Sequence, residues 1–137
     1  MDKIEYEGYG LYVVIKSNCS LVVEERDGKF FLPFAYGLKG ETTMKCARRI
    51  IRKTSLTPPL FLKSLPYVKR EDASLLKKEA RGDWPLGMKS FPIYAYLCEM
   101  EEGELSPSLP YRVIERSTWD SLPLKEREIV SLCNRQE

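Results

Sequence analysis

The residues best suited to chemistry are cations gathered in one short stretch of the chain. Between Lys39 and Lys53 there are six basic residues and a single acidic one, Glu41. Guanidinium and ammonium groups bind phosphate oxygens directly, without a metal ion between them. The stretch therefore predicts a metal-independent contact to a phosphate-bearing nucleotide or RNA, made by Lys39, Arg52 and Lys53.

A helix over residues 42–54 must position these cations. At about 100° per residue one face is apolar, and it consists of Met44, Ala47, Ile50, Ile51 and Thr54. The opposite face consists of Lys45, Arg48, Arg49, Arg52 and Lys53. Thr42 or Glu41 caps the start, and two prolines at 58 and 59 end the element. The same pattern is typical of the solvated side of an amphipathic helix, so the basic face also has a purely structural interpretation.

The segment 32–57, LPFAYGLKGETTMKCARRIIRKTSLT, resembles the signature of the Nudix family. That signature reads Gly, five residues, Glu, seven residues, then Arg-Glu-apolar-x-Glu-Glu-x-Gly-apolar. Glu41, Arg49 and Ile51 match it in type and spacing. The resemblance implies that Glu41 and Arg49 form a structural pair that braces the loop against the helix. It also implies an α/β (α+β) fold, a Nudix-like α/β/α sandwich with a mixed sheet.

The chain departs from the signature where the family holds its divalent metal. The three carboxylate positions are occupied by Ile50, Lys53 and Thr54, and the two glycine positions by Ala35 and Leu56. Magnesium needs hard oxygen ligands, and Lys53 places a positive charge where the cation would lie. We therefore predict no metal site, no cofactor and no catalytic residue of the family type, and a protein that leans away from being an enzyme.

The sequence gives little evidence for catalytic or metal sites of other kinds. The chain has no histidine, which removes His-based nucleophilic catalysis and His-ligated zinc. Its four cysteines are scattered without a C-x-x-C pair, which indicates free thiols. Trp84, in the loop 82–87, is a candidate to stack on a base, although a tryptophan beside a proline more often packs a loop onto the core.

Strand patterns surround the predicted helix. We expect strands at 9–15, 20–25, 29–32, 60–68, 91–100 and 111–115, the second and third joined by a hairpin at Asp27-Gly28. We expect further helices at 71–81 and 124–134. Trp119 is expected in the core before the last helix.

Composition sets broad bounds. The 137 residues suit a single domain, 1–137, with an ordinary apolar fraction of 43%. The net charge of +2 makes no global case for nucleic acid or membranes, and no apolar run is long enough to cross a bilayer. These features predict a soluble, cytoplasmic protein.

The function predicted from the sequence is a non-catalytic Nudix-like domain that binds a phosphate-bearing nucleotide or RNA through its basic helix. Two alternatives stay open. One is a scaffold for protein–protein contacts or homo-oligomers. The other is a hydrolase of nucleoside-diphosphate-linked substrates, with metal ligands relocated to Glu41 and two of Glu71, Asp72, Glu79 and Asp83.

Overall fold

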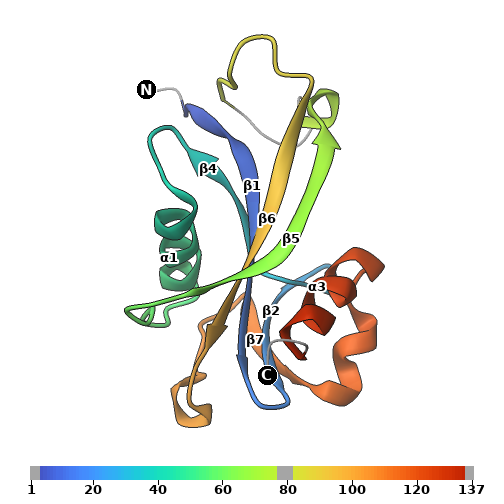
Figure 1. The fold of residues 1–137 in the computed structure, drawn as a ribbon. Helices are drawn as coiled ribbons and strands as arrows, with labels where there is room; N and C mark the ends of the chain where they lie inside the picture. Colours follow the sequence, from blue (N-terminus) through green and yellow to red (C-terminus); the bar gives the residue numbers. More distant parts are fainter. Residues whose placement is uncertain (1–3, 77–81, 135–137) are drawn as a thin grey trace.

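The computed structural model describes residues 4–76 and 82–134. These residues form a seven-stranded sheet with helices packed against it (Figure 1). The strands are β1 (Tyr6–Ser17), β2 (Ser20–Arg26), β3 (Lys29–Phe31), β4 (Phe34–Leu38), β5 (Lys63–Asp72), β6 (Ser90–Glu99) and β7 (Tyr111–Glu115). Their order is β3-β2-β1-β6-β5, with β4 also paired to β1 and β7 to β2. β1 and β6 are parallel and the other pairs are antiparallel, so the predicted mixed sheet is confirmed.

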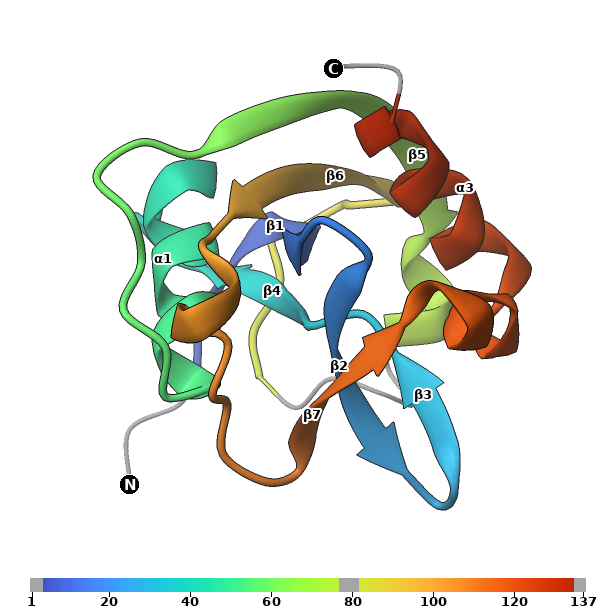
Figure 2. The ribbon, with the colours of Figure 1, turned by 90° about the horizontal axis from the view of Figure 1, so that it is seen from below.

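Helices cover both faces of the sheet. Seen from below, α1 (Thr43–Lys53) lies on one side of the strands and α3 (Leu124–Asn134) on the other (Figure 2). The described residues also contain three short 3-10 helices: η1 (Ala73–Leu75), η2 (Glu102–Glu104) and η3 (Arg116–Ser121). This arrangement confirms the predicted α/β/α sandwich. None of the described helices is long and apolar enough to span a membrane.

β1 divides the apolar core into two halves because alternate side chains of a strand point to opposite faces. Leu11, Val13 and Ile15 pack with α1, whereas Tyr12 and Val14 pack on the side of α3. All five are buried. A run that is apolar at every position is typical of a central strand covered on both faces.

Local turn chemistry follows the sequence closely. Asp27 and Gly28 have φ angles of 52° and 76°, and they join β2 to β3 as the predicted two-residue hairpin. The side chain of Thr42 accepts a hydrogen bond from the backbone N–H of Lys45 and so caps α1. The last helix and the strand before it have their predicted bounds.

Other elements differ from the prediction. β4 was not predicted from the sequence. A Cβ at Gly37 would collide with the ring of Tyr9, so this strand needs glycine to approach β1. β5 begins at Lys63 rather than 60, beyond the two prolines. The predicted helix over 71–81 was wrong at its start, where β5 continues to Asp72 and η1 follows. Residues 77–81 lie outside the described residues.

Candidate functional site

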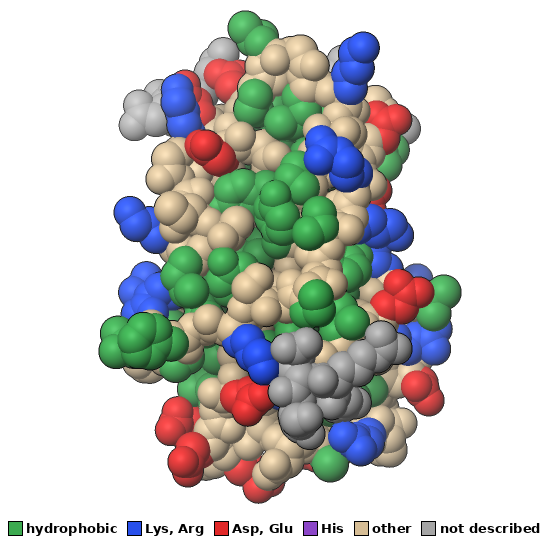
Figure 3. Space-filling view, viewed as in Figure 1, with side chains coloured by type: hydrophobic (Ala, Val, Ile, Leu, Met, Phe, Trp, Pro, Cys, Tyr) green, Lys and Arg blue, Asp and Glu red, His purple; other side chains and the backbone are tan. Residues whose placement is uncertain are grey.

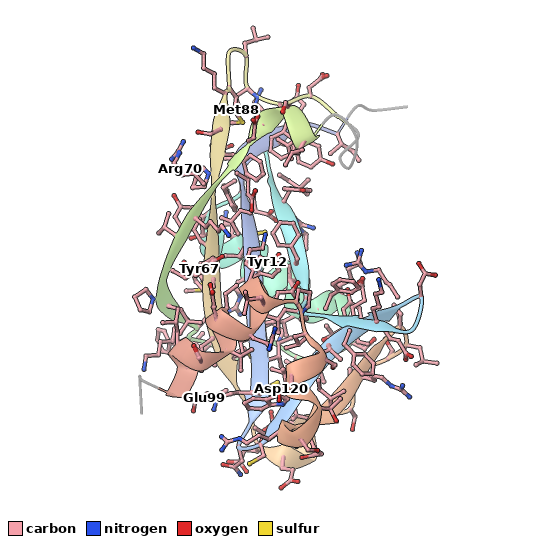
Figure 4. All side chains as sticks on the ribbon, turned by 90° about the vertical axis from the view of Figure 1, so that its right-hand side faces the viewer. Tyr12, Tyr67, Arg70, Met88, Glu99 and Asp120 are labelled. Atoms are coloured by element: carbon pink, nitrogen blue, oxygen red, sulfur yellow. The ribbon has the colours of Figure 1, made fainter. Side chains whose placement is uncertain are left out.

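A cleft of about 810 Å³ lies between the sheet and the start of α3. Its floor is aromatic and comes from three neighbouring strands: Tyr12 of β1, Phe34 and Tyr36 of β4, and Phe91 of β6. Figure 4 looks at the sheet from this side, with Tyr12 labelled beside α3. Ring centroids are 4.6 Å apart for Tyr12 and Phe34, and 5.0 Å apart for Phe34 and Tyr36. Such a floor favours a flat, aromatic ligand.

Trp84 packs against this floor from the same side of the sheet, and it is not among the residues that line the cleft. Its indole stacks on the ring of Tyr6 at 4.4 Å, with 16° between the planes. It meets Tyr36 edge-on at 5.2 Å and lies 5.8 Å from Phe91. Because one face of the indole is covered, the structure shows the packing role, and stacking of a base on Trp84 stays a prediction.

Charged side chains stand along the rim of the cleft. The Lys125 Nζ lies 3.0 Å from the Glu71 Oε1 and 5.7 Å from the centroid of the Tyr12 ring. The side chain of Arg26 is 60% exposed, and its Nε lies 2.8 Å from the Glu24 Oε1. Two cations therefore stand beside an aromatic floor, each close to a carboxylate that holds it in place.

Glu126 is a buried carboxyl group at the cleft, with only 4% of its surface exposed. Its carboxylate accepts a hydrogen bond from the backbone N–H of Leu32 and so ties α3 to the segment between β3 and β4. Burial raises the pKa of Glu126, although the Leu32 hydrogen bond and the charges of Lys125 and Arg26 act against the rise. Sequence reasoning missed this residue, since a glutamate in the first turn of a helix is ordinary.

The cations predicted to bind phosphate do not come together. Lys39 pairs with Glu5 at 3.4 Å, before α1 begins, whereas Arg52 and Lys53 are exposed in its last turn. The 11 residues of α1, at about 1.5 Å each, separate the two groups by roughly 16 Å. None of the three borders the cleft, which lies across the sheet from α1.

Glu41 and Arg49 form a bidentate ion pair. The Arg49 Nε donates to the Glu41 Oε2 at 2.9 Å, and an Arg49 Nη donates to the Glu41 Oε1 at 3.0 Å. The backbone N–H of Leu38 also donates to this carboxylate, at 3.0 Å. Burial works to raise the pKa of Glu41, but the hydrogen bonds from Arg49 and Leu38 outweigh it, so that pKa lies below its usual value.

The three positions that the Nudix resemblance assigns to metal ligands do not suit a divalent cation. Ile50 and Thr54 are 2% and 0% exposed and face the core under α1. The Thr54 hydroxyl donates to the carbonyl of Ile51 at 2.6 Å. Lys53 points to solvent with its own positive charge. Among residues 4–76 and 82–134, no three Cys, Asp or Glu side chains gather into a group that would hold a metal.

No protein-family model matches the chain, and no curated protein matches its sequence. Solved structures match over almost its whole length. The dihydroneopterin triphosphate pyrophosphohydrolase of E. coli is 12% identical, with a TM-score of 0.68 over 96% of this chain and 99% of that one. The NUDIX domain of Shewanella oneidensis NrtR, solved with ADP ribose, is 12% identical, with a TM-score of 0.65 over 99% and 89%.

A third match is the C-terminal domain of mouse MUTYH in its complex with human PCNA, 9% identical with a TM-score of 0.65 over 95% of this chain and 89% of that one. At such identities the likeness concerns the fold alone. Several of the matching structures are Nudix proteins, and their likeness over almost the whole chain shows that it has the Nudix fold.

Proposed function

We propose that this chain is a binding domain that holds a nucleotide in the cleft between the sheet and α3. The observation that carries the proposal is the aromatic floor under a charged rim. A base or a similar flat ring would lie over Tyr12 and Phe34, and base–aromatic stacking contributes about 1–3 kcal/mol per base. Arg26 and Lys125 would meet the negative charge of the attached phosphates.

The proposed domain does not hydrolyse its ligand by the metal-assisted route. That route needs oxygen ligands for a divalent cation, and Ile50, Lys53 and Thr54 supply none that is both anionic and accessible. Relocated ligands are not favoured either. Glu71 is engaged by Lys125, Asp72 caps η1 through Ser74, and Glu79 lies outside the described residues.

The proposed ligand class has outside support. The NUDIX domain of Shewanella oneidensis NrtR was solved in complex with ADP ribose, and its fold matches 99% of this chain. ADP ribose joins an aromatic base to two phosphates, which is the combination that the cleft suits. It is therefore the first ligand to try.

RNA or phosphate recognition by α1 stays a separate prediction. Arg52 and Lys53 lie in the last turn, where cations stabilise a helix by meeting its free carbonyls and its dipole. The same dipole disfavours an anion there. The position of these two side chains therefore favours the cleft over α1 as the nucleotide site.

The test of the proposed function is calorimetric titration with ADP ribose, ATP and a dinucleoside polyphosphate, each with magnesium and again with a chelator. We expect binding that survives the chelator and leaves the nucleotide intact over a long incubation, as checked by chromatography. Binding or turnover that requires the metal would overturn the non-catalytic proposal. Failure of every nucleotide to bind would overturn the ligand class.

A protein-binding scaffold is the second candidate, because large apolar side chains stand free on the surface. Leu60 and Phe61 are 75% and 81% exposed in the segment between α1 and β5. One of the matching structures, the C-terminal domain of mouse MUTYH, is seen in complex with another protein, human PCNA. The two roles are compatible, since this segment and the nucleotide cleft use different parts of the molecule.

A further inference from the structure

A second hollow lies on the α1 side of the sheet, away from the nucleotide cleft. It has a volume of about 510 Å³ and is lined mainly by Tyr9, Tyr94, Tyr96 and Pro92, with Thr43 and Ser64 at its sides. The outward-facing residues of β6, Pro92, Tyr94 and Tyr96, remain half-buried while their neighbours Ile93, Ala95 and Leu97 are buried. A stretch of apolar sheet is therefore left partly open beside the first turn of α1. We call it the tyrosine groove.

An apolar tip stands beside β5, the strand that carries Ser64 of this groove. Leu60 and Phe61 form the tip, and most of each side chain is exposed. The backbone behind them is held in place, because the Arg48 Nη1 donates to the carbonyls of Pro59 at 2.8 Å and of Leu60 at 3.1 Å. Two consecutive prolines at 58 and 59 restrict it further. A tip that is already ordered loses little entropy when it binds.

Basic residues predominate in the segment that leads from α1 to β5 along this face. From Thr42 to Lys63 the chain contains six basic residues and no acidic one, and one of the six, Arg49, is paired with Glu41. On the other side of the groove, Arg70 stands opposite Pro92 in the register of β5 and β6. It projects sideways from β5 in Figure 4, toward the face seen in Figure 3.

Figure 3 shows this face directly. Hydrophobic side chains gather in its middle, over β5 and β6, and project at its left edge where the chain leaves α1 for β5. Lys and Arg side chains stand along both margins of the gathering, with some Asp and Glu side chains among them. An exposed apolar patch with a charged rim is typical of an interaction surface.

We propose that the tyrosine groove and the tip of Leu60 and Phe61 form a docking site for an acidic, apolar segment of a partner protein. The inference rests on the protein-binding role proposed second above and is independent of the nucleotide cleft. Carboxylates of the segment meet Arg48, Arg52 and Arg70 at the rim, and its apolar side chains fill the groove and cover Phe61. Complementary charge of this kind steers association and fixes the orientation of the partner.

Two other occupants fit this face less well. A second copy of the chain, docked through the same face, would bring its basic rim against an identical rim and be repelled. A single-stranded nucleic acid matches the charge and would stack its bases on rings such as Tyr94 or Phe61, but the aliphatic surface of Leu60 and Pro92 would add nothing to such stacking. The hydroxyl of Tyr96 is also tied to the Thr43 Oγ1 at 2.7 Å, and that of Tyr9 to the carbonyl of Glu41 at 2.7 Å.

The test uses the whole chain as bait for a random dodecapeptide display library, followed by fluorescence polarisation with the enriched peptides. We expect enriched peptides to combine Asp or Glu with aromatic or aliphatic residues. Their affinity should fall about tenfold or more in Phe61→Ser, Tyr94→Ser and Arg52→Glu. Leu86→Ser and Lys29→Glu, which change exposed residues outside this face, are the matched controls and should bind as the unaltered chain does.

Several results would overturn the docking site. The first is a library that yields no enriched acidic peptide. The second is an enriched peptide that binds the Phe61→Ser and Leu86→Ser variants with equal affinity. The third is tight binding of oligouridylate that is abolished in Tyr94→Ser. Concentration-dependent dimerisation lost in Phe61→Ser would assign the face to a second copy instead. Titration of the same variants with ADP ribose reports separately on the nucleotide cleft. Because Tyr94 is half-buried, thermal unfolding is used to check that Tyr94→Ser still folds.

Discussion

Arg49 holds Glu41 with two parallel hydrogen bonds of 2.9 and 3.0 Å, across the turn that precedes α1. The same guanidinium donates to the carbonyl of Tyr36 at 3.0 Å. Tyr36 lines the proposed nucleotide cleft on one side of the sheet, and Arg49 lies on α1 on the other side, so this contact links the two. The pair fixes where β4 ends and how α1 begins.

Loss of this pair should lower stability by an amount that depends on pH. The pKa of Glu41 is lower in the folded chain than in the unfolded chain. The ionised carboxylate therefore stabilises the fold fully above the usual carboxyl pKa. This stabilisation is lost as the pH falls through the lowered pKa. We expect Glu41→Gln to cost about 1–3 kcal/mol at neutral pH, because a charge-assisted bidentate contact is replaced by a weaker one. Urea unfolding from pH 7 down to acid pH should show the two proteins converging. A constant difference at every pH would contradict the assigned ionisation.

Glutamate at the signature positions 50 and 53 should lower the stability of the chain by different amounts. Ile50 is 2% exposed, so Ile50→Glu places a carboxylate in the apolar core and should cost several kcal/mol, about 3 or more. Lys53 is exposed, and Lys53→Glu should cost about 0.5 kcal/mol, mainly through the lost interaction with the end of the helix. Denaturant titration measures both. If Ile50→Glu were tolerated and bound magnesium, the alignment with the Nudix signature would be right in chemistry as well as spacing.

Several elements of this fold could be predicted from the local sequence alone. The apolar run of β1, the Asp27-Gly28 turn and the amphipathic α1 each predict their structure because a single physical preference dominates. β4 was missed because its glycine serves a tertiary contact, the close approach to Tyr9, that no local pattern reveals. The start of β5 was misplaced because Leu60, Phe61 and Leu62 resemble an apolar strand, whereas Leu60 and Phe61 are exposed in the segment before β5.

The candidate site was less accessible to sequence reasoning than the fold. Tyr12, Tyr36 and Phe91 come from three strands and meet only through the pairing of β1 with β4 and β6. Glu126 joins them from α3, which follows more than thirty residues after Phe91. In contrast, Lys39 and Lys53 are near in sequence, yet a helix separates them. Spacing along the chain therefore did not indicate how far apart these cations lie, and it gave no signal for the aromatic floor.

The nucleotide cleft and α1 can be separated as binding sites by two pairs of charge changes. Arg26→Ala with Lys125→Ala should weaken the binding of ADP ribose about tenfold or more, because each cation lies at the rim of the cleft. Arg52→Glu with Lys53→Glu should leave that affinity unchanged. Calorimetry at two salt concentrations gives both numbers. The reverse order of effects would move the nucleotide to α1, as the sequence first indicated.

Trp84 should act on the cleft indirectly. Trp84→Ala removes the ring that stacks on Tyr6 and meets Tyr36 and Phe91, so we expect a loss of about 2–4 kcal/mol in stability. Trp84→Phe keeps an aromatic ring and should restore most of that stability and the affinity for ADP ribose. If Trp84 instead stacked directly on a base, Trp84→Ala would abolish binding while leaving stability nearly unchanged. Thermal unfolding and calorimetry on the same samples distinguish the two.

Glu126 should make the folded chain less stable as pH rises through the weakly acidic range. Its pKa is raised by burial, so the unfolded chain gives up this proton at a lower pH than the folded chain does. Between those two pKa values the unfolded state binds fewer protons, and the free energy of unfolding therefore falls as pH increases.

Glu126→Gln removes that titration while keeping an oxygen that accepts from the Leu32 N–H, so it should be at least as stable as the unaltered chain at neutral pH. Glu126→Leu leaves the Leu32 N–H without an acceptor and should cost about 1–3 kcal/mol at any pH. Urea unfolding of the three proteins at pH 4, 5.5 and 7 makes the comparison. If Glu126→Gln were destabilised as strongly as Glu126→Leu, the carboxylate would be ionised in the fold and its charge, rather than its shape, would hold α3 to the segment between β3 and β4.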